Sequence, residues 1–113
     1  MNPSTLIQKN IFSLISTNKD EDALKICKEL LNDYRNSDFL YKALGLIFFK
    51  KKEFSKSIDL FLNSLNLNEN QADVLNNLGV CFKENNEFEN SILYYKKAIE
   101  IEPNYAEAYV NLG

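Results

Sequence analysis

The 113-residue sequence contains no histidine and no tryptophan, and it has only three glycines and two cysteines. Because histidine is the commonest general base and metal ligand, its absence argues against catalysis and against a metal site. Three scattered glycines cannot build a phosphate-binding loop of the P-loop or dinucleotide type. We therefore expect that this stretch of chain is not an enzyme and that it binds no cofactor and no metal.

Charge and hydropathy exclude two further classes of partner. The net charge is −3, and the one basic run, Lys50–Lys52, is followed at once by Glu53, so no nucleic-acid partner is expected. We interpret this run as a solvated turn, with contact to a phosphate or an acidic partner as the alternative. No apolar run reaches the roughly 20 residues that a membrane-spanning helix needs, so no membrane partner is expected either.

The N-terminal segment and the cysteines indicate a cytoplasmic protein. The apolar patch from Ile11 to Ile15 is interrupted by Ser13 and is too short for a secretory signal. The two cysteines, Cys27 and Cys81, are too few for a disulfide scaffold, and both fall on apolar stripes. We expect both cysteines to be buried packing residues.

What the sequence does contain is a period of 34 residues. Gly45, Gly79 and Gly113 share this spacing (79 − 45 = 34; 113 − 79 = 34), and each glycine follows a leucine. Many other residues align at the same offset: Phe48 with Phe82, Phe54 with Phe88, Ser57 with Ser91, Ile58 with Ile92, and Phe61 with Tyr95. A fixed period of this length is typical of repeat architectures.

Each period is predicted to be two helices joined by a turn. Its apolar residues recur three or four apart, which is the spacing of an amphipathic helix, and polar turns lie at Lys50–Glu53 and Asn85–Glu87. A glycine inside a helix costs about 1 kcal/mol relative to alanine. We therefore expect Gly45 and Gly79 to allow close approach of the paired helix. That helix would meet them with small residues, namely Ser57, Ser91 and Ala98.

These residues resemble the tetratricopeptide repeat family. The likeness is closest over 72–105, which carries Leu78, Gly79, Phe82, Phe88, Ser91, Tyr95, Ala98 and Pro103 in the family's order and spacing. It implies an all-α fold, a right-handed α-solenoid of antiparallel helical hairpins. The implied repeats are 4–37, 38–71 and 72–105, and 106–113 opens a fourth.

Two of the implied repeats depart from the family pattern. The repeat 4–37 is degenerate, because Ile11 stands where the later repeats have glycine, and it is predicted to be a capping repeat. In the repeat 38–71, Glu69 stands where the family places proline. This replacement predicts that the second helix of that repeat ends less sharply.

The resemblance also implies where a partner binds, because in the family the first helix of each repeat lines a concave groove. The candidate partner-binding residues on that basis are Phe12, Ile15, Phe39, Lys42, Leu46, Phe49, Asn76, Asn77, Val80, Lys83 and Asn111. Phe12, Leu46 and Val80 are 34 apart and would form an apolar row, and Phe49 is the residue most free to meet a partner. The alternative is that this row fills the seam between adjacent first helices.

Two binding modes of the family can be compared with these positions. Asn77 and Asn111 are 34 apart and resemble the asparagine ladder that holds a peptide backbone in the repeats of O-linked sugar transferases, although Ala43 interrupts it. Chaperone-binding members instead hold a C-terminal carboxylate with Lys, Asn and Arg. The equivalent positions here are Gln8, Phe12, Ala43, Asp73 and Asn77. They form no cationic clamp, so we reject that mode.

The leading hypothesis is a protein-interaction module that binds a peptide or a partner protein in the groove. Because 106–113 stops early in a repeat, the alternative is an N-terminal, substrate-positioning repeat region of a larger enzyme such as a glycosyltransferase or sulfotransferase. A third hypothesis is weak self-association through exposed terminal helices, for which Tyr109 and Leu112 are available.

Overall fold

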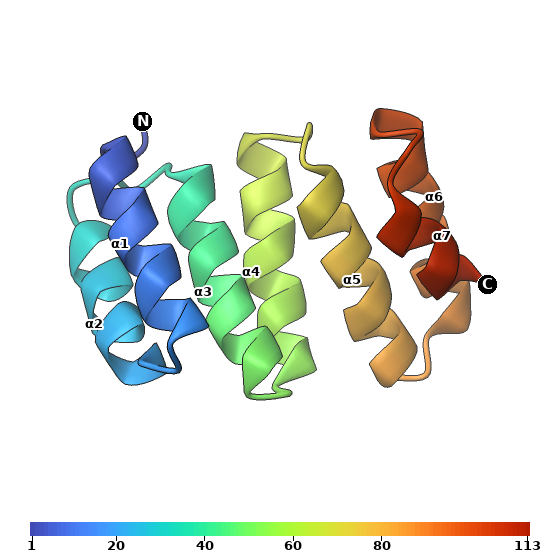
Figure 1. Cartoon of the computed structure of the whole chain (residues 1–113), viewed down its shortest axis with the longest axis horizontal. Helices are drawn as coiled ribbons and strands as arrows, with labels where there is room; N and C mark the ends of the chain where they lie inside the picture. The colour runs from blue at the N-terminus through green and yellow to red at the C-terminus, as the bar shows by residue number, and fades with distance from the viewer.

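The computed structural model describes residues 1–113 and consists of seven α-helices without a strand. The helices are α1 (Thr5–Ser16), α2 (Asp20–Leu30), α3 (Asp38–Lys50), α4 (Phe54–Leu67), α5 (Ala72–Glu84), α6 (Phe88–Ile101) and α7 (Ala106–Leu112). They follow one another along the longest axis of the molecule, which measures 37 Å (Figure 1). The predicted all-α fold of helical hairpins is confirmed.

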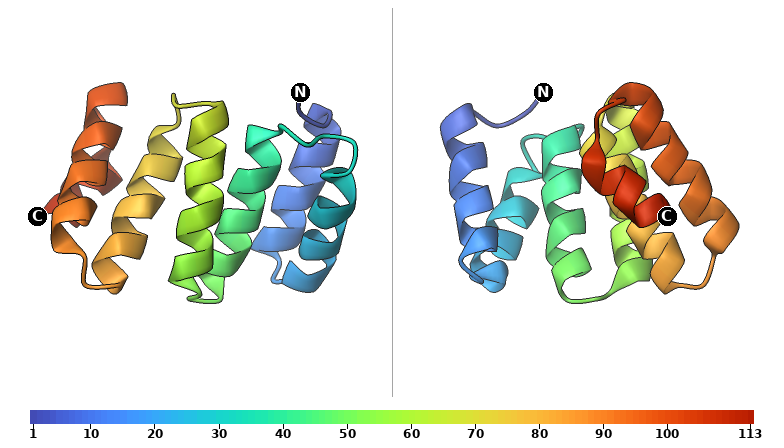
Figure 2. Two further views of the ribbon diagram at one scale, coloured as in Figure 1. Left: turned by 180° about the vertical axis from the view of Figure 1, so that it is seen from behind. Right: turned by 45° about the vertical axis from the view of Figure 1, so that its right-hand side comes forward.

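The helices form two layers. Helix α3 begins at Asp38, α5 at Ala72 and α7 at Ala106, which are steps of 34 residues (72 − 38 = 34; 106 − 72 = 34). Contacts between α1 and α3 and between α5 and α7 place the first helices of successive hairpins side by side. We call this layer, made by α1, α3, α5 and α7, the first-helix face; α2 and α6 come forward when the molecule is seen from behind (Figure 2).

Each of the first three hairpins turns through one residue in the left-handed region. Asn18, Lys52 and Asn86 have φ angles of 63°, 61° and 62° and are themselves 34 residues apart. The next residue in each case donates its N–H to the carbonyl five positions back, at 2.8–2.9 Å. This is the Schellman end of a helix, which glycine or asparagine adopts most readily. The sequence pattern did not reveal it, because Lys52 is neither.

The second helices α4 and α6 end at equivalent positions (101 − 67 = 34), so the prediction that Glu69 would leave α4 less sharply ended is wrong. The buried side chain of Gln71 explains this. Its amide donates to the carbonyls of Ser64 at 3.2 Å and Asn68 at 2.8 Å. Both carbonyls belong to the end of the helix, and that of Ser64 also accepts from the N–H of Asn68 at 2.9 Å.

The periodic glycines do allow close approach of the paired helices. A Cβ on Gly45 would lie 2.5 Å from a ring carbon of Phe61, and a Cβ on Gly79 would meet the ring of Tyr95 in the same way. Of the predicted small residues, the two serines meet the glycines through hydrogen bonds, and Ser57 donates to the Gly45 carbonyl at 3.0 Å. The equivalent Ser91–Gly79 bond measures 2.8 Å. Ala98 instead packs in a separate cluster with Leu75 and Ala108. An aromatic ring over a glycine is therefore the packing unit of both hairpins.

In the first hairpin, the large and the small side chain of this contact are exchanged between the two helices. Ile11, on α1, is buried where the later repeats have glycine, and Cys27, on α2, is buried where they have an aromatic ring. Both belong to one apolar cluster, together with Ala23 at the position of Ser57. The large side chain comes from the first helix and the small one from the second.

The joint between the first and second hairpins is polar where the end of α3 meets the start of α2. Lys50 lies 3.1 Å from Asp20, and Lys51 lies 2.8 Å from Glu21. Lys50 also donates to the carbonyl of Ile15, near the end of α1. The basic run is exposed at a turn, as predicted, and two of its lysines also contact the start of α2.

A second polar contact fastens the N-terminus to the start of α3. The side chain of Asn2 donates to Asp38 at 2.9 Å and accepts from the Ser37 hydroxyl at 2.5 Å. The Ser37 hydroxyl in turn accepts from the N–H of Leu40 at 3.1 Å, which makes it the N-cap of α3. The N-terminal residues thus help to cap a helix of the next repeat.

Both cysteines are free and buried, as predicted. Burial raises the pKa of the Cys27 thiol from 9.0 to about 11 and that of Cys81 to about 12. The thiols are therefore protonated near neutral pH, which is the unreactive form. None of the seven helices is both long and apolar enough to cross a membrane.

Candidate functional site

The first-helix face contains the predicted groove residues, and side-chain contacts close the seam between its helices. The ring of Phe12 on α1 meets the ring of Phe39 on α3 edge to face, with centroids 5.1 Å apart. One repeat later, Lys42 on α3 forms an ion pair with Asp73 on α5 at 3.1 Å. Phe39 and Asp73 are equivalent positions (73 − 39 = 34), so the same site is apolar at one joint and charged at the next.

A pair of carboxamides closes the third joint. Asn111 on α7 donates to the side-chain oxygen of Asn76 on α5 at 3.1 Å. Asn76 is fully buried, and its amide nitrogen has no hydrogen-bond partner. Asn111 is therefore engaged within the chain, whereas Asn77, the other member of the predicted ladder, is only half-buried.

The apolar row is partly open to solvent. Leu46 and Val80 are half-buried, and Phe12 is 36% exposed. Phe49 lies beside Phe54, with ring centroids 5.8 Å apart, and packs against the apolar cluster of the second and third hairpins. The prediction that Phe49 would be the residue most free to meet a partner is therefore wrong, since the ring is held by α4.

Three of the predicted residues do not face solvent. Ile15, Phe39 and Asn76 are buried. Phe39 packs against Phe12 on α1, Asn76 is bonded to Asn111 on α7, and Ile15 lies in the apolar cluster of the first two hairpins. They are packing residues, which corrects their assignment to a binding surface. The remaining predicted residues are at least partly exposed: Phe12, Lys42, Leu46, Phe49, Asn77, Val80, Lys83 and Asn111.

The predicted groove residues include two lysines, of which one is paired and one is unpaired. Lys42 is neutralised by Asp73, whose carboxylate is itself half-exposed. Lys83 is exposed at the end of α5 and lies in no ion pair. Asp73 is one of the clamp-equivalent positions named above, but its ion pair with Lys42 was not predicted. The arrangement offers apolar, amide and cationic contacts, and no nucleophile or metal cluster.

Comparison with known proteins agrees with this geometry. A family model described as tetratricopeptide repeat matches residues 72–105. The crystal structure of MamA is 26% identical, and the match covers 92% of this chain and 61% of that chain with a TM-score of 0.85. Residues 72–105 match a tetratricopeptide repeat, and the fold of the whole chain is similar to that of solved tetratricopeptide structures. The chain spans about three fifths of the length of MamA.

Two structures of lower sequence identity share the fold. The first TPR of Spaghetti (RPAP3), described with a bound HSP90 peptide, is 17% identical with a TM-score of 0.87, over 95% of this chain and 85% of that chain. The Yersinia enterocolitica secretion chaperone SycD is 14% identical with a TM-score of 0.86, over 95% and 86%. No curated protein sequence matches this chain.

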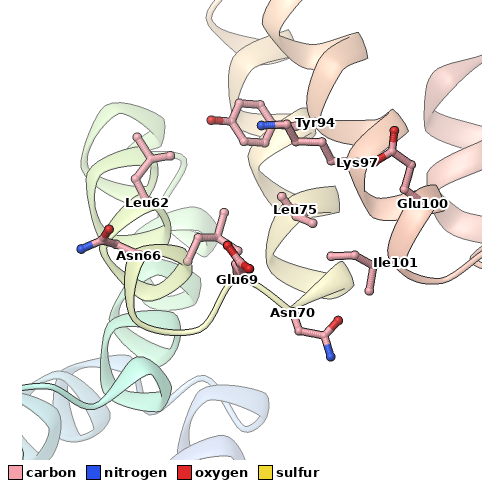
Figure 3. A pocket seen from close by; sticks show the side chains of 10 residues that line it. Leu62, Asn66, Glu69, Asn70, Leu75, Tyr94, Lys97, Glu100 and Ile101 are labelled. Atoms are coloured by element: carbon pink, nitrogen blue, oxygen red, sulfur yellow. The ribbon is translucent and has the colours of Figure 1, made fainter.

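The largest cavity of the helical array lies outside the predicted groove. It measures about 710 Å³ and lies between α4 and α6, above the first turn of α5 (Figure 3). Leu62, Leu75 and Ile101 form apolar walls, and Glu69, Asn70 and Glu100 form a polar rim. The Lys97 ammonium lies 5.0 Å from the centre of the Tyr94 ring. None of the predicted partner-binding residues lines this cavity.

Proposed function

We propose that this chain is a protein-interaction module that binds a peptide or a segment of a partner protein across its first-helix face. The observation that carries the proposal is the strip formed by half-buried Leu46 on α3 and by half-buried Val80 on α5, which lies three residues from both Asn77 and Lys83 along its helix. Apolar side chains with a few polar groups beside them are the usual composition of a peptide-binding surface.

The chemistry of the strip describes the ligand it would take. Leu46 and Val80 would accept apolar side chains. The Asn77 carboxamide would bond to a peptide group, because it offers both a donor and an acceptor. Lys83 would favour an acidic residue at that end. The bound peptide of the Spaghetti structure supports a peptide ligand in general, because the two proteins share the fold.

An enzyme-associated role is not favoured. The descriptions of the compared structures name a TPR domain, a secretion chaperone and MamA, and none of them names an enzyme. The first-helix face also contributes no acid–base pair or nucleophile to a reaction, because its amides and its lysines act by hydrogen bonding and charge. We therefore place the chain in the class of binding modules.

The proposal can be tested without a known partner by selecting peptides from a displayed random library. We expect Val80→Glu to weaken the selected peptides about tenfold or more, because it places a charge where an apolar side chain docks. Asn77→Ala should weaken them less, by about threefold, as for one hydrogen bond. Circular dichroism should show unchanged helicity, since neither side chain is buried in the core.

A matched charge reversal gives the control. Lys83→Glu lies on the proposed strip, whereas Lys96→Glu lies on α6, and both lysines are exposed. We expect the first change to shift the selected peptides away from acidic residues and the second to leave the selection unchanged. Equal effects of the two variants, or binding that survives Val80→Glu, would place the ligand elsewhere.

A further inference from the structure

The cavity between α4 and α6 repeats a smaller one that lies one period earlier in the chain. The smaller cavity measures about 190 Å³, and each of its 6 lining residues stands 34 positions before a residue that lines the cavity of about 710 Å³. The two cavities are therefore the same place in successive repeats. Three of the pairs differ in size or charge: Arg35 and Glu69, Tyr41 and Leu75, and Asn66 and Glu100 (69 − 35 = 34; 75 − 41 = 34; 100 − 66 = 34).

The exchange of tyrosine for leucine accounts for the difference in volume. In the smaller cavity, the Tyr41 side chain reaches the loop between α2 and α3, where its hydroxyl donates to the carbonyl of Arg35 at 3.5 Å. Leu75 is shorter and buried, so it leaves the space above it open. Leu62 and Ile101 line that space and are 38% and 39% exposed. A hollow of this volume with apolar walls is large enough to take side chains of a ligand.

The two cavities also differ in charge. Arg35 is the one charged residue that lines the smaller cavity, whereas the larger one is lined by Glu69, Glu100 and Lys97. Neither carboxylate belongs to one of the ion pairs of the chain. The Lys97 ammonium instead lies over the ring of Tyr94. The larger cavity therefore has two carboxylates that no cation of the chain neutralises.

The position of these carboxylates increases the attraction for a cation. Glu100 lies in the last turn of α6, and Glu69 lies two residues after the end of α4. The C-terminal end of a helix carries a partial negative charge, so a carboxylate is unfavourable there and a cation is favourable. No basic residue stands in the last turn of either helix. A cation from another molecule would thus meet two carboxylates and two helix ends.

From these observations we infer that the cavity between α4 and α6 binds a segment of a partner protein in which a lysine or arginine adjoins a large apolar residue. The apolar side chain packs over Leu75, between Leu62 on one wall and Ile101 on the other (Figure 3). The cation bonds to Glu69 and Glu100, as charged donors and carboxylates do at protein interfaces. This site is separate from the strip on the first-helix face, which favours an acidic residue, so one chain holds two different segments at once.

A displayed random peptide library tests the site when it is selected against the Val80→Glu chain, whose first-helix strip is blocked. We expect the selected peptides to be enriched in a lysine or arginine beside a large apolar residue. Their affinity should fall as salt is added, because exposed ion pairs are screened. Failure to select any peptide, or selection of peptides without a basic residue, would overturn the inference whether or not the strip binds a ligand of its own.

Variants that copy the smaller cavity identify the binding residues. Glu69→Arg and Leu75→Tyr each introduce the residue that stands one period earlier. Each should weaken the selected peptides about tenfold or more, the first by charge repulsion and the second by filling the cavity. Glu69 is exposed, so Glu69→Arg should leave the helicity unchanged and decides the test even where Leu75→Tyr disturbs the core.

Glu29→Arg is the matched control. It makes the same change of charge at an exposed residue of α2 that does not line the cavity, and it should leave the affinities unchanged. Equal weakening by Glu29→Arg, or full affinity in Glu69→Arg, would overturn the inference. Sedimentation of the chain without peptide gives a further check, because self-association that Glu69→Arg abolishes would assign the cavity to a second copy and overturn the inference as well.

Discussion

The first hairpin and the two that follow it fill the same contact between paired helices, but with the large and the small side chain exchanged between those helices. In the second and third hairpins, the first helix supplies a glycine and the second helix supplies the ring of Phe61 or Tyr95. In the first hairpin, Ile11 and Cys27 stand at these two positions, and both are buried. The large side chain has moved from one helix to the other.

This exchange shows that the hairpin constrains the combined volume at the contact and leaves open which helix provides it. Protein cores tolerate substitutions that keep the total volume and penalise those that change it. The family pattern describes one of these two arrangements, with glycine on the first helix. The first hairpin differs from that pattern in sequence, but the contact between its two helices is also filled.

The largest expected effect comes from giving the second hairpin the two residues, isoleucine and cysteine, that the first hairpin has at this contact. Phe61→Cys alone should lower the free energy of unfolding by about 3 kcal/mol, because it leaves a cavity. Gly45→Ile alone should lower it by about as much, because the new side chain overlaps the ring of Phe61. Urea unfolding should show that the double variant loses about 1–3 kcal/mol less than the sum of the two.

The reciprocal exchange is the control for that experiment. Ile11→Gly and Cys27→Phe together should be tolerated better than either change alone, for the same reason of volume. Strict additivity in both pairs would mean that these residues do not share one packing site. The comparison of the hairpins would then have no energetic basis.

Alkaline pH should weaken the hairpins that contain cysteine. Burial raises the pKa of Cys27 from 9.0 to about 11, so the folded chain keeps a proton that the unfolded chain loses. The stability contributed by this thiol is complete below pH 9 and is lost as the pH rises through 11. The slope should approach about 1.4 kcal/mol per pH unit for each buried thiol.

Substitution of a thiol assigns this pH dependence to one hairpin. Cys27→Ala should lower the stability at neutral pH and should make its fall above pH 9 less steep. The measurement is the urea midpoint between neutral pH and pH 11. An unchanged slope in Cys27→Ala would show that other groups, such as Tyr95, whose pKa burial also raises, control alkaline unfolding.

Removal of the serine hydroxyl that bonds to the glycine carbonyl should have a smaller effect on stability. Ser57→Ala removes the bond to the Gly45 carbonyl and should lower the free energy of unfolding by about 1 kcal/mol. The first hairpin already has Ala23 at this position. Ser55→Ala, on the exposed side of the same helix, should change the stability by less than about 0.5 kcal/mol. An equal loss in both variants would rule out a specific contribution of the bond.

The smallest effect is expected at the turn between the helices. Lys52 has a φ of 61°, whereas the equivalent positions of the other two hairpins hold asparagine. Lys52→Asn should raise the free energy of unfolding by about 0.5 kcal/mol, because asparagine tolerates the left-handed region better. Asn86→Lys should do the opposite. A thermal shift of the same sign in both variants would contradict this expectation.

Much of the fold could be predicted from the sequence because a repeat is periodic. The spacing of Gly45 and Gly79 and the apolar residues three or four apart were sufficient to predict helices, turns and close contacts. The end of α4 could not be predicted in this way. It depends on the Gln71 side chain, which reaches carbonyls three and seven residues back, and no periodic signal accompanies it.

The candidate site was less predictable, for a physical reason. Helical periodicity determines which side of a helix a residue occupies, but it does not determine how far the neighbouring helix covers that side. Ile15, Phe39 and Asn76 therefore have groove positions by register and are nevertheless buried. The ion pair of Lys42 with Asp73 depends in the same way on how two helices approach each other.

The polar joint between the first two hairpins has a consequence for how the array opens. Lys50 and Lys51 connect to Asp20 and Glu21 through partly exposed ion pairs, which added salt screens. The same joint also contains the largest buried apolar cluster, in which Ile11 and Ile15 pack with Leu40, and salt does not weaken that contact in this way. Rising ionic strength should thus loosen the start of α2 from the end of α3, while the apolar cluster keeps the first two hairpins packed together.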